Sequence, residues 1–345
     1  MKPRNFLRTV TLLLIVVGIL LANSAKPAMG MRRAVALYTH NLGGTFNIAG
    51  VAIAKVVSSN SPIKMIVKPT SGPGFWLPLL NKGEGHIGIT NALDAGWAWK
   101  GFSEYGLEKS PNIRMLLPGG EVSGSIDLIV RKDSNIHTIA DLKGKRVAGG
   151  YKGAPACHRK ILAQLRGSGL TYNDVIQVPV ADYLSGLRAL REGRADAVFG
   201  GSYISARNRE INSAIGIRVL PIVDTSKPEN AKIYDELLPG LHSVWTKKKG
   251  VLDKDQLTIS QRLFNLLCYK GIDDDTVREI VHTLYTHYAK LPPLSSRLKS
   301  WVPEGFFDPD TRIPYHSGTI KYYKEIGVWT TAAEKRQKEL LSQTE

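Results

Sequence analysis

Cysteine is nearly absent from this 345-residue chain, which contains only Cys157 and Cys268. The two residues lie far apart and in dissimilar surroundings, so they do not form the repeated pattern of a disulfide framework. We expect each to be a free, buried residue that packs like a small hydrophobe. A single bridge between them is the alternative.

The sequence also lacks the motifs of several enzyme classes. It has no Walker A sequence, no Gly-x-Gly-x-x-Gly that opens a helix after a strand, no Gly-x-Ser-x-Gly elbow and no His-Glu-x-x-His. We therefore expect no cofactor and no metal site. Cys157 and His158 are adjacent near a predicted helix start, where a thiolate and an imidazole could cooperate. Neighbouring helical residues point about 100° apart, so a secreted enzyme with Cys157 as nucleophile is kept only as an alternative.

Long hydrophobic runs are limited to one, over residues 10–22, which follows Lys2, Arg4 and Arg8 and precedes small residues. This order is typical of a secretory signal peptide. We predict a signal over residues 1–30, cleaved after Gly30 or Ser24, with an uncleaved anchor as the alternative. The expected location of the mature protein is the periplasm.

Acidic residues are scarce relative to basic ones, with 30 Asp and Glu against 46 Lys and Arg, a formal charge of +16. Removal of the signal takes four basic residues and no acidic one, which leaves +12. A basic protein suggests nucleic-acid binding, but export and the scatter of the basic residues argue against that partner. A positive surface attracts small anions or an acidic membrane partner, or serves solubility alone.

Short β-type runs alternate with helical patterns through the middle of the chain, which predicts an α/β fold with mostly parallel sheets. In the first helical pattern, Phe46, Ala49, Ile53 and Val56 recur on one face. The sequence shows no internal repeat, low-complexity tract or Gly/Ser linker. Strands are predicted at residues 34–38, 64–68, 86–89, 114–117, 127–131, 146–148, 175–178, 196–199 and 217–221.

The pattern changes after Pro221. Residues 229–238 and 247–249 are predicted as surface excursions, and residues 257–269 as another extended run. Asp273 is expected to cap a helix, and a last helix is expected to begin near Ser317.

Five segments share one design, in which a strand ends in small or polar residues and a helix follows. In open α/β sheets, ligands bind beyond the carboxyl ends of the strands, and the N–H groups that begin a helix favour an anion. One such segment is an ordinary turn, but five of them without a competing catalytic motif predict a small-molecule cleft. The segments are residues 39–45, 69–74, 90–94, 149–154 and 200–203.

Several stretches carry a family resemblance. They are Gly-Gly-Thr at 43–45, Lys-Pro-Thr-Ser-Gly at 68–72, the Gly-Glu-containing stretch at 80–95 and the Tyr-Tyr-Lys-Glu-containing tail at 316–327. With these, the chain resembles the TAXI family of solute-binding proteins, the extracytoplasmic receptors of one branch of the TRAP transporters. The similarity covers about residues 35–329. Residues 139–147 and 190–199 resemble bilobed binding proteins more generally.

The resemblance implies a two-lobed periplasmic binding protein type II-like fold with a ligand cleft between the lobes. Lobe I would comprise residues 31–124 plus 259–345, and lobe II residues 125–258. Such a receptor closes around a small solute and delivers it to a TRAP-type integral membrane permease. We expect a monomer that binds an organic anion of the carboxylate or acidic amino acid class. A sensor that reports a solute to a membrane kinase is a further alternative.

The sequence departs from the family at the turn of lobe II, where Gly-Ser-Gly-Thr is replaced by Lys-Gly-Ala-Pro-Ala at 152–156. Two hydroxyls are missing, and Pro155 removes a backbone donor. Tyr151 and Lys152 are candidates to replace them, or the pocket prefers a less polar solute. We expect backbone N–H groups of Gly44 and Gly153 to meet the anion, and Asp94 to meet an amine or hydroxyl or to cap a helix. The full set of predicted ligand-binding residues is Gly44, Thr45, Thr70, Ser71, Asn91, Asp94, Tyr151, Gly153 and Tyr203.

Overall fold

The computed structural model of the chain describes residues 33–101 and 108–344. The predicted signal peptide over residues 1–30 lies outside the described residues. Ala34–Glu345 forms one compact unit. Among the described residues, no helix combines the length and apolarity that a membrane span requires.

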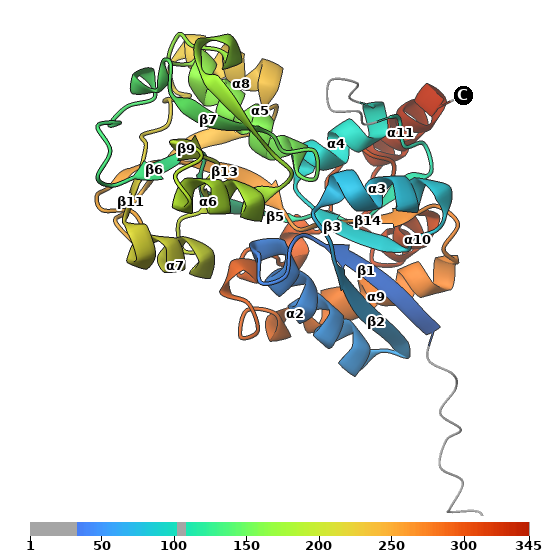
Figure 1. Cartoon of the computed structure of the whole chain (residues 1–345). Helices are drawn as coiled ribbons and strands as arrows, with labels where there is room; N and C mark the ends of the chain where they lie inside the picture. Colours follow the sequence, from blue (N-terminus) through green and yellow to red (C-terminus); the bar gives the residue numbers. More distant parts are fainter. Residues whose placement is uncertain (1–32, 102–107, 345) are drawn as a thin grey trace, which may run out of the picture. The chain divides into compact units, whose positions relative to one another are not determined.

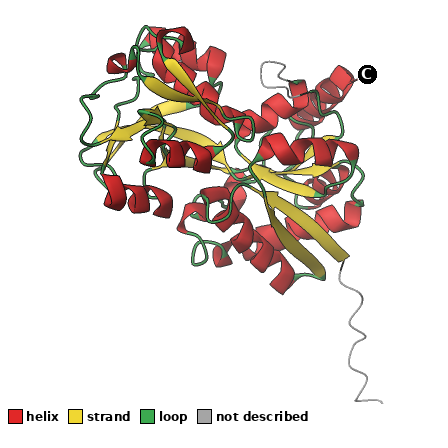
Figure 2. Cartoon of the chain, viewed as in Figure 1, coloured by secondary structure: helices red, strands yellow, loops and turns green. Residues whose placement is uncertain are grey.

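The described strands form three sheets (Figures 1 and 2). The first sheet has the order β2-β1-β3-β14-β4, the second β11-β6-β9-β7-β8, and the connecting sheet β10-β5-β13-β12. The strands are β1 Arg33–Thr39, β2 Ile63–Pro69, β3 Ile87–Thr90, β4 Ile113–Leu117, β5 Gly120–Ile126, β6 Ile129–Arg131, β7 Arg146–Gly150, β8 Ile176–Val180, β9 Ala197–Val198, β10 Gly201–Ser202, β11 Ile217–Val219, β12 His242–Thr246, β13 Gln256–Leu263 and β14 Asn265–Tyr269.

Helices separate most of these strands. The α-helices are α2 Thr45–Asn60, α3 Pro73–Lys82, α4 Ala92–Lys100, α5 Pro155–Arg166, α6 Tyr183–Arg191, α7 Ala206–Ile215, α8 Pro228–Leu237, α9 Asp274–His287, α10 Ser317–Glu325 and α11 Thr331–Leu341. Short 3₁₀ helices are η2 Ala140–Leu142, η3 Tyr172–Asp174, η4 Tyr288–Lys290, η5 Ser296–Leu298, η6 Pro303–Gly305 and η7 Ser342–Thr344.

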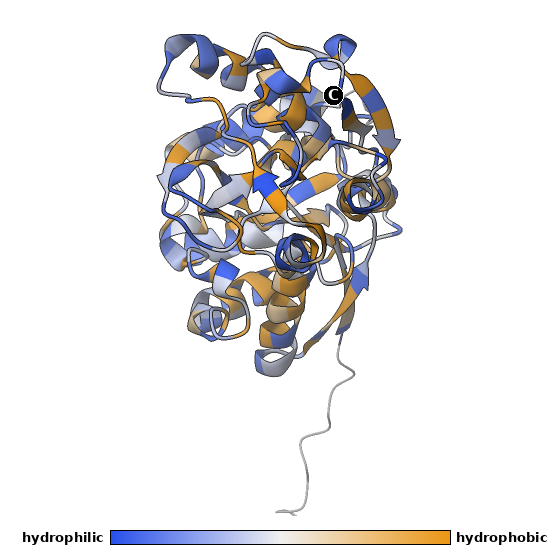
Figure 3. Ribbon diagram, turned by 60° about the vertical axis from the view of Figure 1, so that its left-hand side comes forward, coloured by the Kyte–Doolittle hydropathy of each residue, from blue (hydrophilic) through white to orange (hydrophobic). Residues whose placement is uncertain are grey.

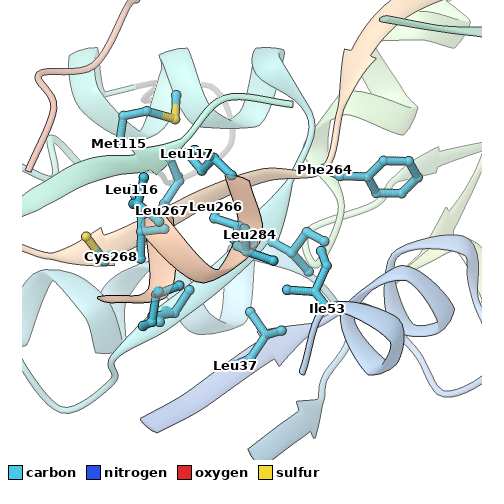
Figure 4. Close-up of a cluster of buried hydrophobic side chains, with 14 of the residues drawn as sticks. Leu37, Ile53, Met115, Leu116, Leu117, Phe264, Leu266, Leu267, Cys268 and Leu284 are labelled. Atoms are coloured by element: carbon cyan, nitrogen blue, oxygen red, sulfur yellow. The ribbon is translucent and has the colours of Figure 1, made fainter. Parts of the chain in front are cut away.

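The core around the first sheet joins residues from both ends of the chain. Leu37 of β1 and Ile53 of α2 belong to the same buried cluster as Leu266 of β14 and Leu284 of α9, and Figure 4 shows these side chains with their neighbours. Blue and orange elements accordingly lie side by side in Figure 1. Burial of such aliphatic side chains contributes roughly 1.5–3 kcal/mol each, so the C-terminal segments are integral to this sheet.

The second sheet has its own buried cluster, which includes Leu128, Val147, Ile161 and Val198. In Figure 3 hydrophobic and hydrophilic segments alternate along the helices as well as along several strands. This alternation is the expected pattern for helices with one face against a sheet.

The connecting sheet carries the chain between the other two. Strand β5 follows β4 of the first sheet and precedes β6 of the second, and β13 runs antiparallel to β5 before continuing into β14. Phe264, between β13 and β14, has a φ of 69° and is fully buried. This left-handed conformation is rare for a bulky residue, so the chain turns sharply where it enters the first sheet.

The nine predicted strands are all present, although their ends differ by up to two residues. Three expectations are wrong. The sheets are mixed rather than mostly parallel, because β14, β6 and the whole connecting sheet pair in antiparallel fashion. Residues 229–238 form most of helix α8, which buries Tyr234 and Leu237, rather than a surface excursion. Helix α11 after Gly327 was not expected.

The division into two lobes at residues 124/125 and 258/259 stays a prediction. The helix cap at Asp273 is confirmed, because its side chain accepts a hydrogen bond from the N–H of Thr276. The helix predicted near Ser317 is confirmed as α10. Both cysteines are free and buried, as expected.

Candidate functional site

A cavity of about 100 Å³ lies among the carboxyl ends of strands from all three sheets. It is therefore placed where the topology of α/β sheets favours ligand binding. Its lining combines aromatic and aliphatic side chains with a few charged groups. The lining residues are His40, Asn41, Gly44, Thr45, Phe46, Asn91, Asp94, Val122, Ser125, Ala154, Ala156, Cys157, Lys160, Tyr183, Phe199, Gly201, Ser202, Gln261, Leu263 and Arg297.

Helix α2 begins at this cavity. Gly43 has a φ of 74°, which suits glycine, and its N–H donates to Oδ1 of Asn47 at 3.0 Å. The N–H of Gly44 donates to the carbonyl of Asn41 at 2.9 Å, so it is already paired. No side chain caps this helix. The amides of its first turn, at Thr45 and Phe46, have no partner within the helix and add positive partial charge to the cavity.

Helix α5 begins at the same cavity but meets a carboxylate of the protein itself. Oδ1 of Asp94 accepts a hydrogen bond from the N–H of Ala156 at 3.2 Å. Asp94 belongs to α4, so the contact joins two helices far apart in the sequence. The N-terminal anion position of α5 is therefore filled by Asp94.

Asp94 is held on all sides. Its Oδ2 accepts from Nδ2 of Asn91 at 2.6 Å and from Oγ1 of Thr90 at 3.2 Å. Asn91 also caps α4 by accepting from the N–H groups of Leu93 and Asp94. Burial raises the pKa of Asp94 to about 6, against the opposing effect of these hydrogen bonds. Asp94 thus caps a helix, one of its two expected roles.

Lys160, also on α5, is buried and lines the cavity. Its Nζ donates to Oε1 of Gln261 at 2.8 Å and lies 5.5 Å from the centre of the Phe199 ring. Burial lowers the pKa of Lys160, while the nearby carboxylates of Asp127 and Asp94 raise it. Two buried acids therefore compensate the charge of this one lysine.

An aromatic wall closes the cavity beside α2. The rings of His40 and Phe46 stack with centres 4.2 Å apart, and Phe46 makes an edge contact with Phe264 at 5.5 Å. Burial lowers the pKa of His40 to about 3, so its ring is neutral at physiological pH. Its buried Nε2 has no hydrogen-bond partner among the described residues.

Arg297, from the 3₁₀ helix η5, is a further charged residue of the lining. Within the described part of the chain, its half-buried guanidinium makes no hydrogen bond or ion pair. Burial lowers the pKa of Arg297, against the opposing effect of the nearby Tyr203, and a guanidinium stays protonated at physiological pH. Five N–H donors on this side chain are thus available.

Four predicted ligand residues, Gly44, Thr45, Asn91 and Asp94, line the cavity. The other five lie elsewhere. Tyr151 is fully buried in the core around the second sheet, where its hydroxyl accepts from the N–H of Phe199 at 3.1 Å. Gly153 donates its N–H to the carbonyl of Ala181 at 2.8 Å. The ring of Tyr203 lies close to Gly124 at the connecting sheet. The remaining two are Thr70 and Ser71.

Thr70 and Ser71 belong to a contact between two loops. Oγ1 of Thr70 donates to the carbonyl of Thr39 at 2.7 Å, while a Cβ on Gly153 would lie 3.0 Å from the side chain of Ser71. The N–H of Gly74 donates to the carbonyl of Gly153 at 3.2 Å. We call residues 70–74 and 152–154 the loop contact.

Sequence reasoning missed Lys160, His40 and Arg297. Lys160 had a signal, because it lies on the face of α5 that also carries Cys157 and Ile161, where a lysine is unusual. Arg297 had none, because it follows Pro292 and Pro293 in an irregular segment.

The surroundings of Cys157 do not activate it. Its thiol is buried, and burial raises its pKa well above the ordinary value. The neighbouring His158 accepts a hydrogen bond at Nδ1 from the N–H of Gly150 and stacks on Tyr172 with ring centres 4.1 Å apart. Its imidazole is thus engaged with β7 and Tyr172.

A larger hollow, of about 810 Å³, lies on the other side of the loop contact and includes Lys82, Lys109 and Lys152. The cavity among the strand ends combines buried charged groups with the ends of strands from all three sheets and is the candidate site. No group of His, Cys, Asp and Glu able to hold a metal occurs among the described residues.

Three solved structures are similar to this chain. A protein of Bordetella bronchiseptica RB50 is 14% identical, with 86% of this chain and 99% of that chain covered and a TM-score of 0.51. The alkanesulfonate-binding protein SsuA of Xanthomonas axonopodis pv. citri is 16% identical over 91% and 84% of the two chains, with a TM-score of 0.49. A TctC solute-binding protein of Polaromonas is 16% identical over 92% and 100%, with a TM-score of 0.44.

The sheets and the connecting strands define a mixed α/β fold with a cavity among the strand ends. The chain belongs to the NMT1-like family, whose family model matches residues 37–327. The NMT1-like family comprises periplasmic solute-binding proteins.

Proposed function

We propose that this protein is the extracytoplasmic receptor of a TRAP-type secondary transporter and that it captures a small organic anion. The observation that carries the proposal is the cavity among the strand ends, which receives positive charge from Arg297 and from the uncapped start of α2. The resemblance to TAXI receptors supports the TRAP-type permease as partner. The periplasm and the signal peptide over residues 1–30 belong to the same proposal.

The proposed binding site differs from the one expected from the sequence. Gly44, Thr45 and Asn91 are retained in it, while Asp94 holds α5 rather than the solute. Lobe closure, between residues 31–124 plus 259–345 and residues 125–258, would enclose the solute. Such closure requires that the solute bind the closed state more tightly than the open one. Thr70, Ser71, Gly153 and Tyr203 would then act in closure, and Tyr151 in the packing of lobe II.

The size of the cavity limits the solute. At roughly 10–15 Å³ for each water-sized group, about 100 Å³ accommodates on the order of seven to ten non-hydrogen atoms. Native mass spectrometry of gently purified protein tests the proposal. We expect one small organic anion per chain, and a stoichiometric nucleotide or oligosaccharide would overturn it.

The enzyme alternative depended on Cys157, and its buried thiol of raised pKa stands against it. Substitution Cys157→Ala should leave the affinity for the co-purified anion within about twofold and lower the stability by at most about 2 kcal/mol. Isothermal titration and urea unfolding measure these two quantities. Loss of a chemical turnover of the bound molecule in this variant would instead favour the enzyme.

A further inference from the structure

The charged groups of the cavity fall into two sets. Lys160 is surrounded by Asp127 and Asp94, which are both buried, and it donates to Gln261. The two carboxyl groups can balance or exceed the single positive charge of Lys160. This set of groups therefore gives an incoming anion no net electrostatic attraction. Bringing a further carboxylate here would add a like charge to a desolvated site, which is costly.

The second set is Arg297 alone. The other cavity cation is Lys160, and no described acid forms an ion pair with Arg297. No nitrogen of Arg297 is among the buried polar atoms without a partner in the described residues, so the guanidinium keeps contact with solvent and its donors are accessible to a solute. A carboxylate supplies a planar pair of acceptors that matches the guanidinium fork.

The rest of the lining is predominantly apolar. Phe46, Val122 and Leu263 line the cavity from the core of the first sheet, and Phe199 and Tyr183 line it from the core of the second. Away from Arg297 and the uncapped start of α2, a second carboxylate on the solute would lie against these side chains or beside Asp94. Either position costs the desolvation of an ion without a compensating partner.

We infer that Arg297 is the specificity-determining residue of the cavity and selects solutes with a single carboxylate on an apolar body. The inference rests on the proposed function and narrows its solute class from organic anions to apolar monocarboxylates. In this arrangement the carboxylate lies at Arg297, and the aliphatic or aromatic body fills the space bounded by Phe46, Val122 and Leu263.

The probes are hexanoate, benzoate, their primary amides, glutarate and adipate. Each is close in size to the solute limit set by the cavity. Isothermal titration of the wild-type protein should give at least one monocarboxylate a roughly 10–100-fold higher affinity than its amide, as expected for loss of a charged hydrogen-bonded pair. Glutarate and adipate should bind at least about tenfold more weakly than the better monocarboxylate.

The variants are Arg297→Gln, Arg297→Lys and, as a matched control, Lys299→Gln. Lys299 is exposed two residues away, so the control removes the same charge outside the cavity. In Arg297→Gln the preference for acid over amide should fall to within about threefold, whereas Arg297→Lys should keep part of it because the charge remains but the fork is lost. Lys299→Gln should keep the full preference. Thermal unfolding checks that each variant is folded.

The outcomes separate this inference from the proposed function. If Arg297→Gln is folded and keeps the preference for acid over amide, Arg297 does not select the carboxylate and the inference is overturned. If a dicarboxylate binds wild type as tightly as the monocarboxylates, the receptor function stands but the inference fails. If no acid binds wild type, the organic-anion function itself fails.

Discussion

Helices α2 and α5 both begin at the cavity after a glycine-containing turn, yet their first turns have different partners. No side chain caps α2, whereas the carboxylate of Asp94 accepts from the N–H of Ala156 in α5. The same local pattern thus gives one helix start that is available to a ligand and one that the protein fills itself. The anion-binding tendency of a helix N-terminus decides function only after the neighbouring side chains are known.

The largest expected effect concerns Asp94. Its pKa, raised by burial from 3.8 to about 6, means that the folded state binds this proton more readily than the unfolded state. The resulting stability is fully present below about pH 4 and is lost as the pH rises through about 6. The stability of wild type minus that of Asp94→Asn should therefore rise by about 2 kcal/mol from pH 7 to pH 4.5. Urea unfolding at several pH values measures this difference.

Asp141 provides a control of opposite sign. Its exposed carboxylate accepts from the N–H groups of His137 and Thr138, which lowers its pKa. Its stabilising contribution is lost as the pH falls, so the difference between wild type and Asp141→Asn should decrease toward acid. Parallel stability curves for wild type and Asp94→Asn would mean that Asp94 is not the buried cap described here.

The second prediction places a carboxylate at the start of α2, as Asp94 does at the start of α5. In Gly44→Asp, a carboxylate at the N-cap position would occupy the first turn of α2, and Gly44→Asn is the uncharged control. The backbone of Gly44, with φ −75° and ψ 165°, accepts either residue, although the new Cβ would lie 3.0 Å from the carbonyl oxygen of Asn41. Affinity for the better of hexanoate and benzoate should fall at least about tenfold in the Asp variant relative to the Asn variant.

Isothermal titration compares the two Gly44 variants directly, and thermal unfolding should show them equally stable to within about 1 kcal/mol. Equal affinities in the two variants would show that the start of α2 does not face the bound anion.

The smallest effect concerns the loop contact. In Gly74→Ala the new Cβ would lie 2.1 Å from the carbonyl oxygen of Lys152, so the loops must separate. Alanine is favoured over glycine in a helix by roughly 0.5–1 kcal/mol, so α3 itself should not weaken. We expect a roughly threefold loss of affinity for the same acid and, because backbone atoms must move, a loss of stability of roughly 1–3 kcal/mol.

Gly305→Ala is the control for this variant, because its Cβ would meet no atom within 4 Å. Isothermal titration compares the two variants. Unchanged affinity in Gly74→Ala would show that the loop contact does not influence solute binding.

Much of the fold was predictable because its determinants are local. The strands β1, β2 and β7 and the cap at Asp273 follow from short apolar runs and from one side chain beside a helix. The antiparallel pairing of β14 was not predictable in this way, because it depends on a long return of the chain through β13.

Only the part of the candidate site that follows strands of the first sheet was predictable from the sequence. Gly44, Thr45 and Asn91 lie directly after strands, so their approach to the cavity follows from topology. Two features of the site depend on contacts between segments that are far apart in the sequence. They are the carboxylate of Asp94 at the start of α5 and the position of Arg297 in the cavity lining. Asp94 and Ala156, for example, are 62 residues apart. Such contacts leave no periodic signal in the sequence.

A crystal structure of the protein with its co-purified solute tests the central claim most directly. We predict a carboxylate in the cavity, bonded to the guanidinium of Arg297, with Asp94 still accepting from the N–H of Ala156. A solute carboxylate at the N-terminus of α5, with Asp94 displaced, would contradict the account.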